Sequence, residues 1–484
     1  MAAGLLSVFV WLLPLLLSTV FFYSRRGPFL DPLCSYLSWN CANQPLVISG
    51  LTTTPTDPVL YGPVLQQYLH KFAVNEDLGG SLAVFVDGEP VIDVFAGFKD
   101  LRHTIIYDNR TLNQVYSSGK VLEGILIARL VDKGLLDYEE KISTYWPEFA
   151  QNGKENVRLK DLMMHQAGVQ YLDDDKGDLS WALLRDRTRW SAHLARQKHH
   201  FFSGSEPSDK QQLPQRAYHA VTRGWYLDEI VRRVDPQGRD LDQLARDELM
   251  AAYPDVELYY GALPNAADWD DRLTPMHDYP VLRLLGRLFI PHALQTHAYL
   301  GTPGLAPLHK ISSRLFQTKS QTFKSLALPM ARRARDFRTK DAHHVPSTSF
   351  SLKTNAHSLA RLMSMMANQG ASYNSSEPNL ISQATYERAT HHTVELEDHV
   401  TLDKHPISHG GWIRTRNFFP DLEGVLVQGW GGAGGSLTVW LEELKMGFCY
   451  VTNAMGVVDF TLGDGRAKKL LVLAVQARKQ QLGL

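Results

Sequence analysis

The alternation of apolar and polar residues is clearest near the start of the chain. Residues 81–86 (SLAVFV) and 90–98 (PVIDVFAGF) are rich in β-branched and aromatic side chains and flank the step Asp87-Gly88. An Asp-Gly step between two such runs is typical of a tight turn, so this segment predicts a β-hairpin. Before it, residues 63–74 (PVLQQYLHKFAV) have the apolar spacing of an amphipathic helix.

After the hairpin the pattern becomes mainly helical, and strand-like runs reappear near the end of the chain. The segment VLEGILIARLVDKG, which follows Lys120, predicts a long apolar helix that stops near Gly134. Residues from about 140 to 400 have a mainly helical period with Gly and Pro breaks, including a helix over 357–370 capped by Gly370. The last elements are three strand-like runs and a closing helix, at 424–430, 436–441, 446–453 and 465–480.

This order of elements predicts an α+β fold. The strands from both ends of the chain build one antiparallel sheet of five or more strands, and helices pack on it. The first and last helices of this domain flank the sheet. A large, mainly helical subdomain, roughly residues 135–400, is inserted between the two groups of strands, within a domain that covers 58–480.

The N-terminus predicts a membrane anchor. Residues 4–23 are uncharged and are followed at once by Arg25-Arg26. About 20 apolar residues can span a bilayer, whereas the apolar core of a signal peptide is usually shorter. No clean small-x-small cleavage site follows, so we expect residues 1–23 to be an uncleaved anchor, with a cleaved secretory signal as the alternative. Residues 24–57 are Pro-rich and indicate a linker.

The side of the membrane stays open at this point. The arginine pair after the apolar run favours a cytoplasmic domain by the positive-inside rule. Two N-glycosylation acceptors, at Asn109 and Asn374, fit the secretory pathway instead, although about that many arise by chance. Cys34 and Cys41 can pair in an oxidising compartment or remain two free thiols, and Cys449, in the apolar run MGFCYV, indicates a buried inert thiol.

Composition narrows the class of function. The chain has 484 residues, 44% of them hydrophobic and 21% charged, with a net charge of -1, which is ordinary for a globular protein. The near-neutral charge argues against a nucleic-acid partner. The histidine doublets at 199–200, 343–344 and 391–392 lack the spacing of zinc ligands, so we expect no metal and no other cofactor.

The most informative chemical motif is Ser117-Ser118-Gly119-Lys120 at the start of the long apolar helix. A serine and a lysine three residues apart lie on one helix face, about one turn apart. A lysine neutralised by its surroundings can take the proton of a serine hydroxyl and turn it into a nucleophile. Backbone N–H groups at a helix start also favour developing negative charge.

Two later segments can supply the rest of such a site. Tyr218 in Tyr218-His219-Ala220 can pass a proton if a nearby lysine lowers the pKa of its phenol, although an ordinary buried tyrosine explains it too. The glycine-rich stretch 428–436 leaves main-chain N–H donors accessible to a substrate carbonyl, or is simply a turn between strands. No Gly-x-Ser-x-Gly elbow occurs, which argues against an α/β-hydrolase.

Taken in order, these segments resemble the serine β-lactamase and penicillin-binding-protein superfamily, in its class C-like carboxylesterase branch. That superfamily has Ser-x-x-Lys, then Tyr-x-Asn, then Lys-Thr-Gly or His-x-Gly on a strand at the sheet edge. The matching segments are SSGK, YHA and WGG, supported by LAVFVDGEPVIDVFAG, LKDLMMHQAGV and GFCYVTNAM. The similarity runs from about residue 60 to the C-terminus and implies the β-lactamase/transpeptidase-like fold.

The resemblance also implies roles for single residues. Ser117 would form an acyl-enzyme, and Lys120 and Tyr218 would act as base and proton relay. The oxyanion hole would use the backbone N–H groups of Ser117 and Ala433. The substrate pocket would be lined by Trp430, Gly431, Gly432 and His219.

Two departures from the family motifs bear on the substrate. Ala220 stands where the second motif has Asn, and Trp430 stands where lactamases have Lys or His. Those positions help to orient a β-lactam and its carboxylate, so we expect a carboxylesterase for small or lipid-like esters. The alternatives are a peptidase or amidase of the same fold, and a catalytically silent, membrane-anchored binding or assembly module. Specificity is expected from the insertion around 170–345.

Overall fold

The computed structural model describes residues 45–52, 54–174, 179–201, 215–278, 320–326, 347–391, 395–456 and 465–484, and single residues at 14, 177 and 317. The predicted anchor, Cys34 and Cys41 lie outside these residues. Within the described part of the chain, no helix combines the length and apolar character needed to cross a bilayer.

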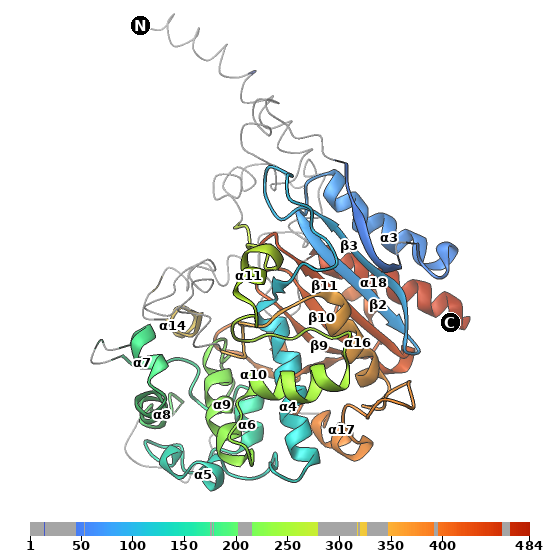
Figure 1. Ribbon diagram of the computed structural model, residues 1–484. Coiled ribbons are helices and arrows are strands. Elements are labelled where there is room, and N and C mark those ends of the chain that lie inside the picture. The colour runs from blue at the N-terminus through green and yellow to red at the C-terminus, as the bar shows by residue number, and fades with distance from the viewer. Residues whose placement is uncertain are drawn as a thin grey trace, which may run out of the picture.

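One antiparallel sheet of seven strands joins the two ends of the described chain (Figure 1). The strand order is β1-β3-β2-β11-β10-β9-β8, and the pairing of β2 with β11 connects the N-terminal strands to the C-terminal ones. This confirms the α+β prediction and the sheet of five or more strands. The strands are β1 Ile48–Thr52, β2 Gly79–Val86, β3 Glu89–Gly97, β8 Ile413–Thr415, β9 Val427–Gly431, β10 Leu437–Leu441 and β11 Met446–Thr452.

The predicted hairpin is β2–β3. Asp87 and Gly88 both have left-handed backbone, with φ of 50° and 88°, as a two-residue turn of the primed type requires. All of β2 and the part of β3 from Val91 onward are buried, because helices cover both faces of the sheet. The edge strand β1 lies inside the range predicted to be a linker, so regular structure begins before residue 58.

Two terminal helices and one internal helix cover the sheet. Helices α3 (Pro58–Ala73) and α18 (Gly465–Leu482) pack against each other, and α16 (Ala356–Ala367) packs on β11, β2 and β10 from the other side (Figure 1). The Asp57 carboxylate caps α3, accepting from the Val59 and Leu60 N–H groups at 3.0 Å each. Although α16 lies in the range predicted for the insertion, it forms part of the layer on the sheet.

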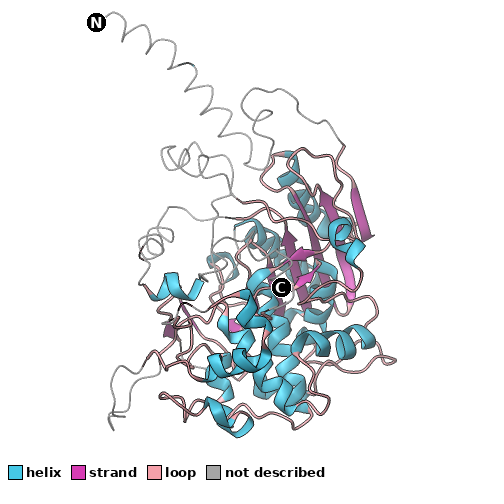
Figure 2. Ribbon diagram, turned by 60° about the vertical axis from the view of Figure 1, so that its left-hand side comes forward, coloured by secondary structure: helices cyan, strands magenta, loops and turns pink. Residues whose placement is uncertain are grey.

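The other helices gather on the α16 side of the sheet (Figure 2). Most are short, because Gly, Pro and turn residues interrupt the helical period. They are α4 Lys120–Asp132, α5 Ile142–Tyr145, α6 Leu159–Met163, α7 Trp181–Arg185, α8 Arg187–Ala195, α9 Thr222–Val234, α10 Leu241–Leu244, α11 Ala266–Arg272, α14 Gln321–Leu326 and α17 Gln383–Ala389, with a π-helical turn at Ala245–Met250. Two small sheets pair β4 (Asn113–Gln114) with β5 (Lys353–Thr354) and β6 (Leu396–Glu397) with β7 (Lys404–His405).

Helix α4 runs through the middle of this helical layer. All its residues except Arg129 and Asp132 are buried, the charged Lys120 and Glu123 included. Gly124 permits the close packing, because a Cβ there would collide with the Gly410 carbonyl and the Trp412 ring. The start of α4 is therefore held firmly from several sides, and the residues of the SSGK motif lie at that point.

Candidate active site

Ser117 lies on a tight turn that leads into α4. A 3-10 helix, η1 (Tyr116–Gly119), precedes the first residue of α4, Lys120, so the α-helix begins three residues later than the motif suggested. Tyr116 has a φ of 49°, a left-handed conformation that costs a bulky residue about 1 kcal/mol or more. Ser117 is in the first turn, where backbone N–H groups have no acceptor within the helix. Its N–H is therefore available to a ligand.

The structure brings together the three predicted catalytic side chains. Lys120 Nζ lies 3.3 Å from Ser117 Oγ, and the Tyr218 hydroxyl donates to the same Oγ at 2.6 Å. Lys120 Nζ also lies 4.9 Å from the centroid of the Tyr218 ring. Ser117 keeps 7% of its surface exposed, whereas Lys120 and Tyr218 keep 0% and 2%. The serine is thus the member of the group with the most access to an incoming molecule.

Lys120 is held in a setting that disfavours its charge. Its Nζ donates to the Ala220 carbonyl at 2.7 Å and to the Ser349 carbonyl at 2.8 Å. Complete burial, and then the positive charge of Arg223, lower the pKa of Lys120 well below its usual value, while Glu123 opposes the shift. A neutral amine is therefore far more accessible near neutral pH than in a free lysine, as a general base requires.

Tyr218 differs from the expectation of a lowered pKa. Burial raises the pKa of its phenol, and this outweighs the hydrogen bond with Ser117 and the nearby charge of Arg223, which act in the other direction. The side chain is therefore a neutral proton donor near neutral pH. Its ring stacks on Trp430 with centroids 5.6 Å apart and an angle of 22°, and its backbone N–H donates to the Asp398 carboxylate at 3.0 Å.

The glycine-rich segment forms a turn that is clamped to η1. The Ser436 hydroxyl donates to the Val115 carbonyl at 2.9 Å and lies 2.9 Å from the Ser118 hydroxyl. Gly432 permits this approach, since a Cβ there would collide with the Val115 carbonyl. The turn's own hydrogen bonds use the N–H groups of Gly432 and Gly435 and leave out that of Ala433. Ala433 thus lies on a turn fixed to the one that carries Ser117, and its oxyanion role stays a prediction.

Two of the predicted pocket residues, His219 and Trp430, are buried beside the catalytic group. His219 is fully buried; its Nδ1–H donates to the Ala217 carbonyl at 2.7 Å and its Nε2 accepts from the Val169 N–H at 3.2 Å. Burial lowers the pKa of His219 to about 3, so the ring is neutral. It joins two loops, and its predicted place in the substrate pocket stays a prediction. Trp430 is the next-to-last residue of β9 and its ring lies beside that of Tyr218, while its predicted role in lining the substrate pocket stays a prediction.

Sequence reasoning missed a set of polar residues behind the site. Glu123 and Arg223 form an ion pair of 2.6 Å in which both side chains are 0% exposed. The Asp398 carboxylate accepts the N–H groups of Tyr218, Val400 and Thr401. One available signal was the lone glutamate in the otherwise apolar run VLEGILI. Within the described residues, no cluster of three or more His, Cys, Asp or Glu side chains could hold a metal ion.

Comparison with known proteins agrees with this geometry. The family model for beta-lactamases matches residues 72–472, most of the chain. The chain belongs to the beta-lactamase family. The matched range contains Ser117, Lys120, Tyr218 and the Trp430 turn, so the segments that carry the site all lie within it.

Relatives within and around the beta-lactamase family include esterases. The chain is 34% identical over 201 residues to the esterase/beta-lactamase LipL of Mycobacterium tuberculosis. The matched segment covers 42% of this chain and 43% of LipL, which is less than half of either protein. A penicillin-binding protein homologue from Caulobacter crescentus has a TM-score of 0.67 at 26% identity, over 89% of this chain and 100% of that one. A family VIII carboxylesterase has a TM-score of 0.68 at 22% identity with the same coverage and shows the shared fold.

Proposed function

We propose that this beta-lactamase-family protein is a serine hydrolase that forms an acyl-enzyme on Ser117, and that it acts as a carboxylesterase. The observation that carries the proposal is the convergence of Lys120 Nζ and the Tyr218 hydroxyl on Ser117 Oγ, at 3.3 and 2.6 Å. A silent binding module has no chemical need of that arrangement. The similarity to LipL, which is named as an esterase/beta-lactamase, supports a hydrolase of this kind.

Acylation follows from the protonation states of the three side chains. Neutral Lys120 takes the Ser117 proton as Oγ attacks the ester carbonyl carbon. The oxyanion that develops is stabilised by the backbone N–H groups of Ser117 and Ala433. As the bond to the alcohol breaks, Tyr218 gives its phenol proton to the departing alkoxide, and the Lys120 ammonium returns a proton to Tyr218. The alcohol leaves, and the acyl group stays on Ser117.

Deacylation uses the same groups with water in place of serine. Water attacks the acyl carbon, and its proton passes to Lys120, which is again a neutral base. The second tetrahedral oxyanion occupies the same position beside Ser117 and Ala433. When it collapses, Ser117 Oγ leaves and recovers a proton from Lys120. The products are a carboxylic acid and free enzyme.

The residues around the third motif favour neutral esters over β-lactams. The apolar ring of Trp430 occupies the position at which lactamases carry a cation for the substrate carboxylate. Among the described residues, Arg466 donates to the Gly434 carbonyl of this turn, but it is fully buried and paired with Asp77. We therefore infer that the described residues of this turn offer no cation to a free carboxylate beside the scissile bond, which disfavours β-lactams and free peptides.

An amidase is a second candidate because of Tyr218. Amide hydrolysis requires firm protonation of the departing nitrogen. A neutral phenol 2.6 Å from Ser117 Oγ is placed to supply that proton. Ester and anilide substrates with the same acyl group separate the two functions.

We also propose that residues 4–23 tether the protein to a membrane, which would bring lipid-like esters to the site. The support is the uncharged run of about 20 residues in the sequence. Extraction of membranes with alkaline carbonate tests this: an anchored chain stays in the pellet, whereas release into the supernatant contradicts the anchor.

A panel of chromogenic substrates tests the proposed function. We expect the full chain to hydrolyse p-nitrophenyl esters, to hydrolyse the matching p-nitroanilides far more slowly, and not to open nitrocefin. Ser117→Ala abolishes ester turnover, whereas Ser364→Ala, at a buried serine on α16, retains it. Anilide turnover equal to ester turnover supports the amidase, and efficient nitrocefin turnover contradicts the account of the Trp430 position.

A further inference from the structure

Two opposite charges are buried directly behind Lys120. Glu123 on α4 and Arg223 on α9 pair at 2.6 Å, and both side chains are 0% exposed. The loss of hydration on burying such a pair often exceeds the gain from its attraction, so stability alone is a weak reason for its presence. Neither residue contacts Ser117 Oγ, whose hydrogen-bond partners are Lys120 and Tyr218. Any effect of the pair on Ser117 must therefore pass through a residue that contacts it.

Glu123 is connected to Lys120 through residue 349. Its Oε1 accepts from the Thr348 hydroxyl at 2.7 Å and from the Ser349 hydroxyl at 3.0 Å. The carbonyl of the same Ser349 accepts from Lys120 Nζ at 2.8 Å. The Ser349 hydroxyl also accepts from the Gly224 N–H, at 2.9 Å. Glu123 thus fixes the position of one of the two carbonyls that hold the Lys120 amine.

Arg223 is connected to the first turn of α4 from the other side. Its Nη2 donates to the Lys120 carbonyl at 3.3 Å, and its Nη1 donates to the Met163 carbonyl at 3.0 Å. Its positive charge opposes protonation of Lys120, whereas the negative charge of Glu123 favours it. The charges of the pair therefore act on Lys120 in opposite directions, and the removal of either one leaves the other uncompensated.

We propose that the Glu123–Arg223 pair is a positioning device for the hydrolase: it holds the Ser349 carbonyl against Lys120 and balances the charge around the amine. This inference rests on the proposed function, in which neutral Lys120 is the general base. Glu123 and Arg223 are positioning residues, since both act through Lys120. Their effect is therefore expected in the pH profile of kcat/KM. The acid limb of that profile, where activity falls at low pH, reports the protonation of the base.

Single substitutions shift the acid limb in opposite directions. Glu123→Gln leaves the positive charge of Arg223 uncompensated, so Lys120 becomes harder to protonate and the acid limb of kcat/KM moves to lower pH by about 1 unit. Arg223→Gln leaves the negative charge of Glu123 uncompensated and moves the limb to higher pH by about 1 unit. The double variant removes both charges and returns the limb to within a few tenths of a unit of the parent.

The experiment compares these variants with two controls. Glu248→Gln removes a carboxylate that pairs with Arg129 and Lys133 at the far end of the same helix, and it leaves the limb unmoved. Thr348→Val removes a hydrogen bond to Glu123 without a change of charge, so kcat falls and the limb stays in place. The measurements are kcat/KM for a p-nitrophenyl ester from pH 5 to pH 9.5, and the melting temperature of each variant.

The outcomes separate this inference from the function on which it rests. Opposite shifts that cancel in the double variant support the positioning device. Limbs that coincide in all variants, or that move in the same direction, overturn it, as does a loss of activity that only follows the melting temperature. If one single variant does not fold, the direction of the shift in the other still decides, and an unchanged kcat in Thr348→Val contradicts the proposal. A folded parent with neither ester turnover nor reaction with a fluorophosphonate refutes the hydrolase itself.

Discussion

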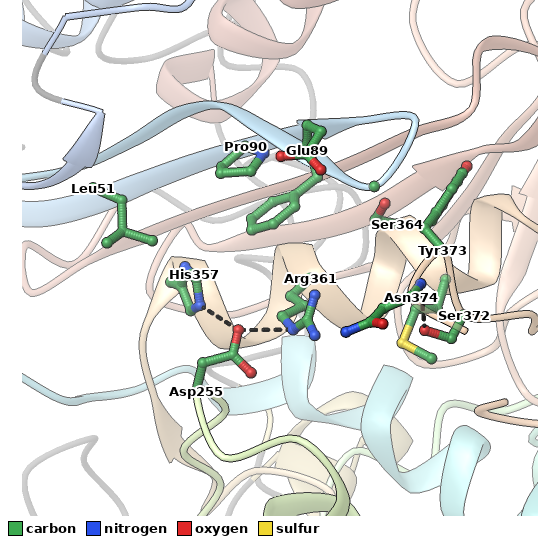
Figure 3. Close-up of a pocket in the computed structure, with 13 residues that line it drawn as sticks. Leu51, Glu89, Pro90, Asp255, His357, Arg361, Ser364, Ser372, Tyr373 and Asn374 are labelled. Carbon is green, nitrogen blue, oxygen red and sulfur yellow. Dashed lines mark hydrogen bonds and ion pairs between the residues drawn. The ribbon is translucent and has the colours of Figure 1, made fainter. Parts of the chain in front are cut away.

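His357 on α16 connects the sheet to the helical layer as a charged clamp. Its Nδ1 lies 2.7 Å from Asp93 of β3, and its Nε2 lies 3.2 Å from Asp255, which also pairs with Arg361 (Figure 3). His357, Asp255 and Arg361 border a surface cavity of about 470 Å³. Burial opposes the charged ring, but the hydrogen bonds and charges of Asp255 and Asp93 outweigh it and raise the pKa of His357 from 6.5 to about 9.

The raised pKa of His357 makes the free energy of unfolding depend on pH. The difference between 6.5 and about 9 corresponds to about 3 kcal/mol, at about 1.4 kcal/mol for each pKa unit. The His357 side chain is 12% exposed, so solvent screens it little. Because the pKa is raised in the folded state, the contribution is complete below about pH 6.5 and is lost as the pH rises through about 9.

His357→Gln tests this clamp. Glutamine retains a hydrogen-bonding amide but carries no charge, so the variant is less stable than the parent at pH 6. We expect the gap in the free energy of unfolding to shrink by about 3 kcal/mol between pH 6 and pH 10, measured by urea denaturation at constant ionic strength. His70→Gln, at an exposed site on α3, serves as the control for the loss of a histidine outside the clamp. A gap for His357→Gln that does not change with pH refutes the charged clamp.

Four further predictions concern the site. Lys120→Met lowers kcat/KM for esters by about 10³-fold or more, and retained activity contradicts its role as the base. Tyr218→Phe retains the stack on Trp430 and the melting temperature but lowers kcat by about 10²-fold or more; unchanged kinetics contradict the relay. Gly432→Ala pushes the Ala433 turn away from Val115 and lowers kcat by about 10²-fold, whereas a loss confined to KM argues against an oxyanion role. Neutral esters react faster than matched esters with a carboxylate beside the scissile bond, and equal rates contradict the inference about Trp430.

The strands were predictable where the local pattern is strong. The β2–β3 hairpin follows from two apolar runs around Asp87-Gly88, and both turn residues adopt the expected left-handed backbone. Strands β9, β10 and β11 follow for the same reason. Two strands were not predicted. Strand β8 has only three residues, and β1 has five and lies next to Pro-rich sequence. Such short edge strands form only because the sheet beside them offers hydrogen-bonding partners, and no local pattern records that.

The site was predictable to the extent that its chemistry depends on short motifs. Ser117 and Lys120 share one turn, so their proximity follows from spacing. The direction of the Tyr218 pKa does not follow, because it depends on burial by segments far away in the sequence. Glu123 and Arg223 are 100 residues apart, and a helical pattern alone would assign such charged residues to the surface. Only the fold pairs them and places them behind Lys120.

The most direct test of the account is whether Ser117 is an activated nucleophile. The full chain is treated with a fluorophosphonate probe beside Ser117→Ala, and the labelled peptide is identified by mass spectrometry. The account predicts labelling of the parent on Ser117, slowed by Lys120→Met and absent in Ser117→Ala. A folded parent that is not labelled, or a label that persists in Ser117→Ala, contradicts the central claim.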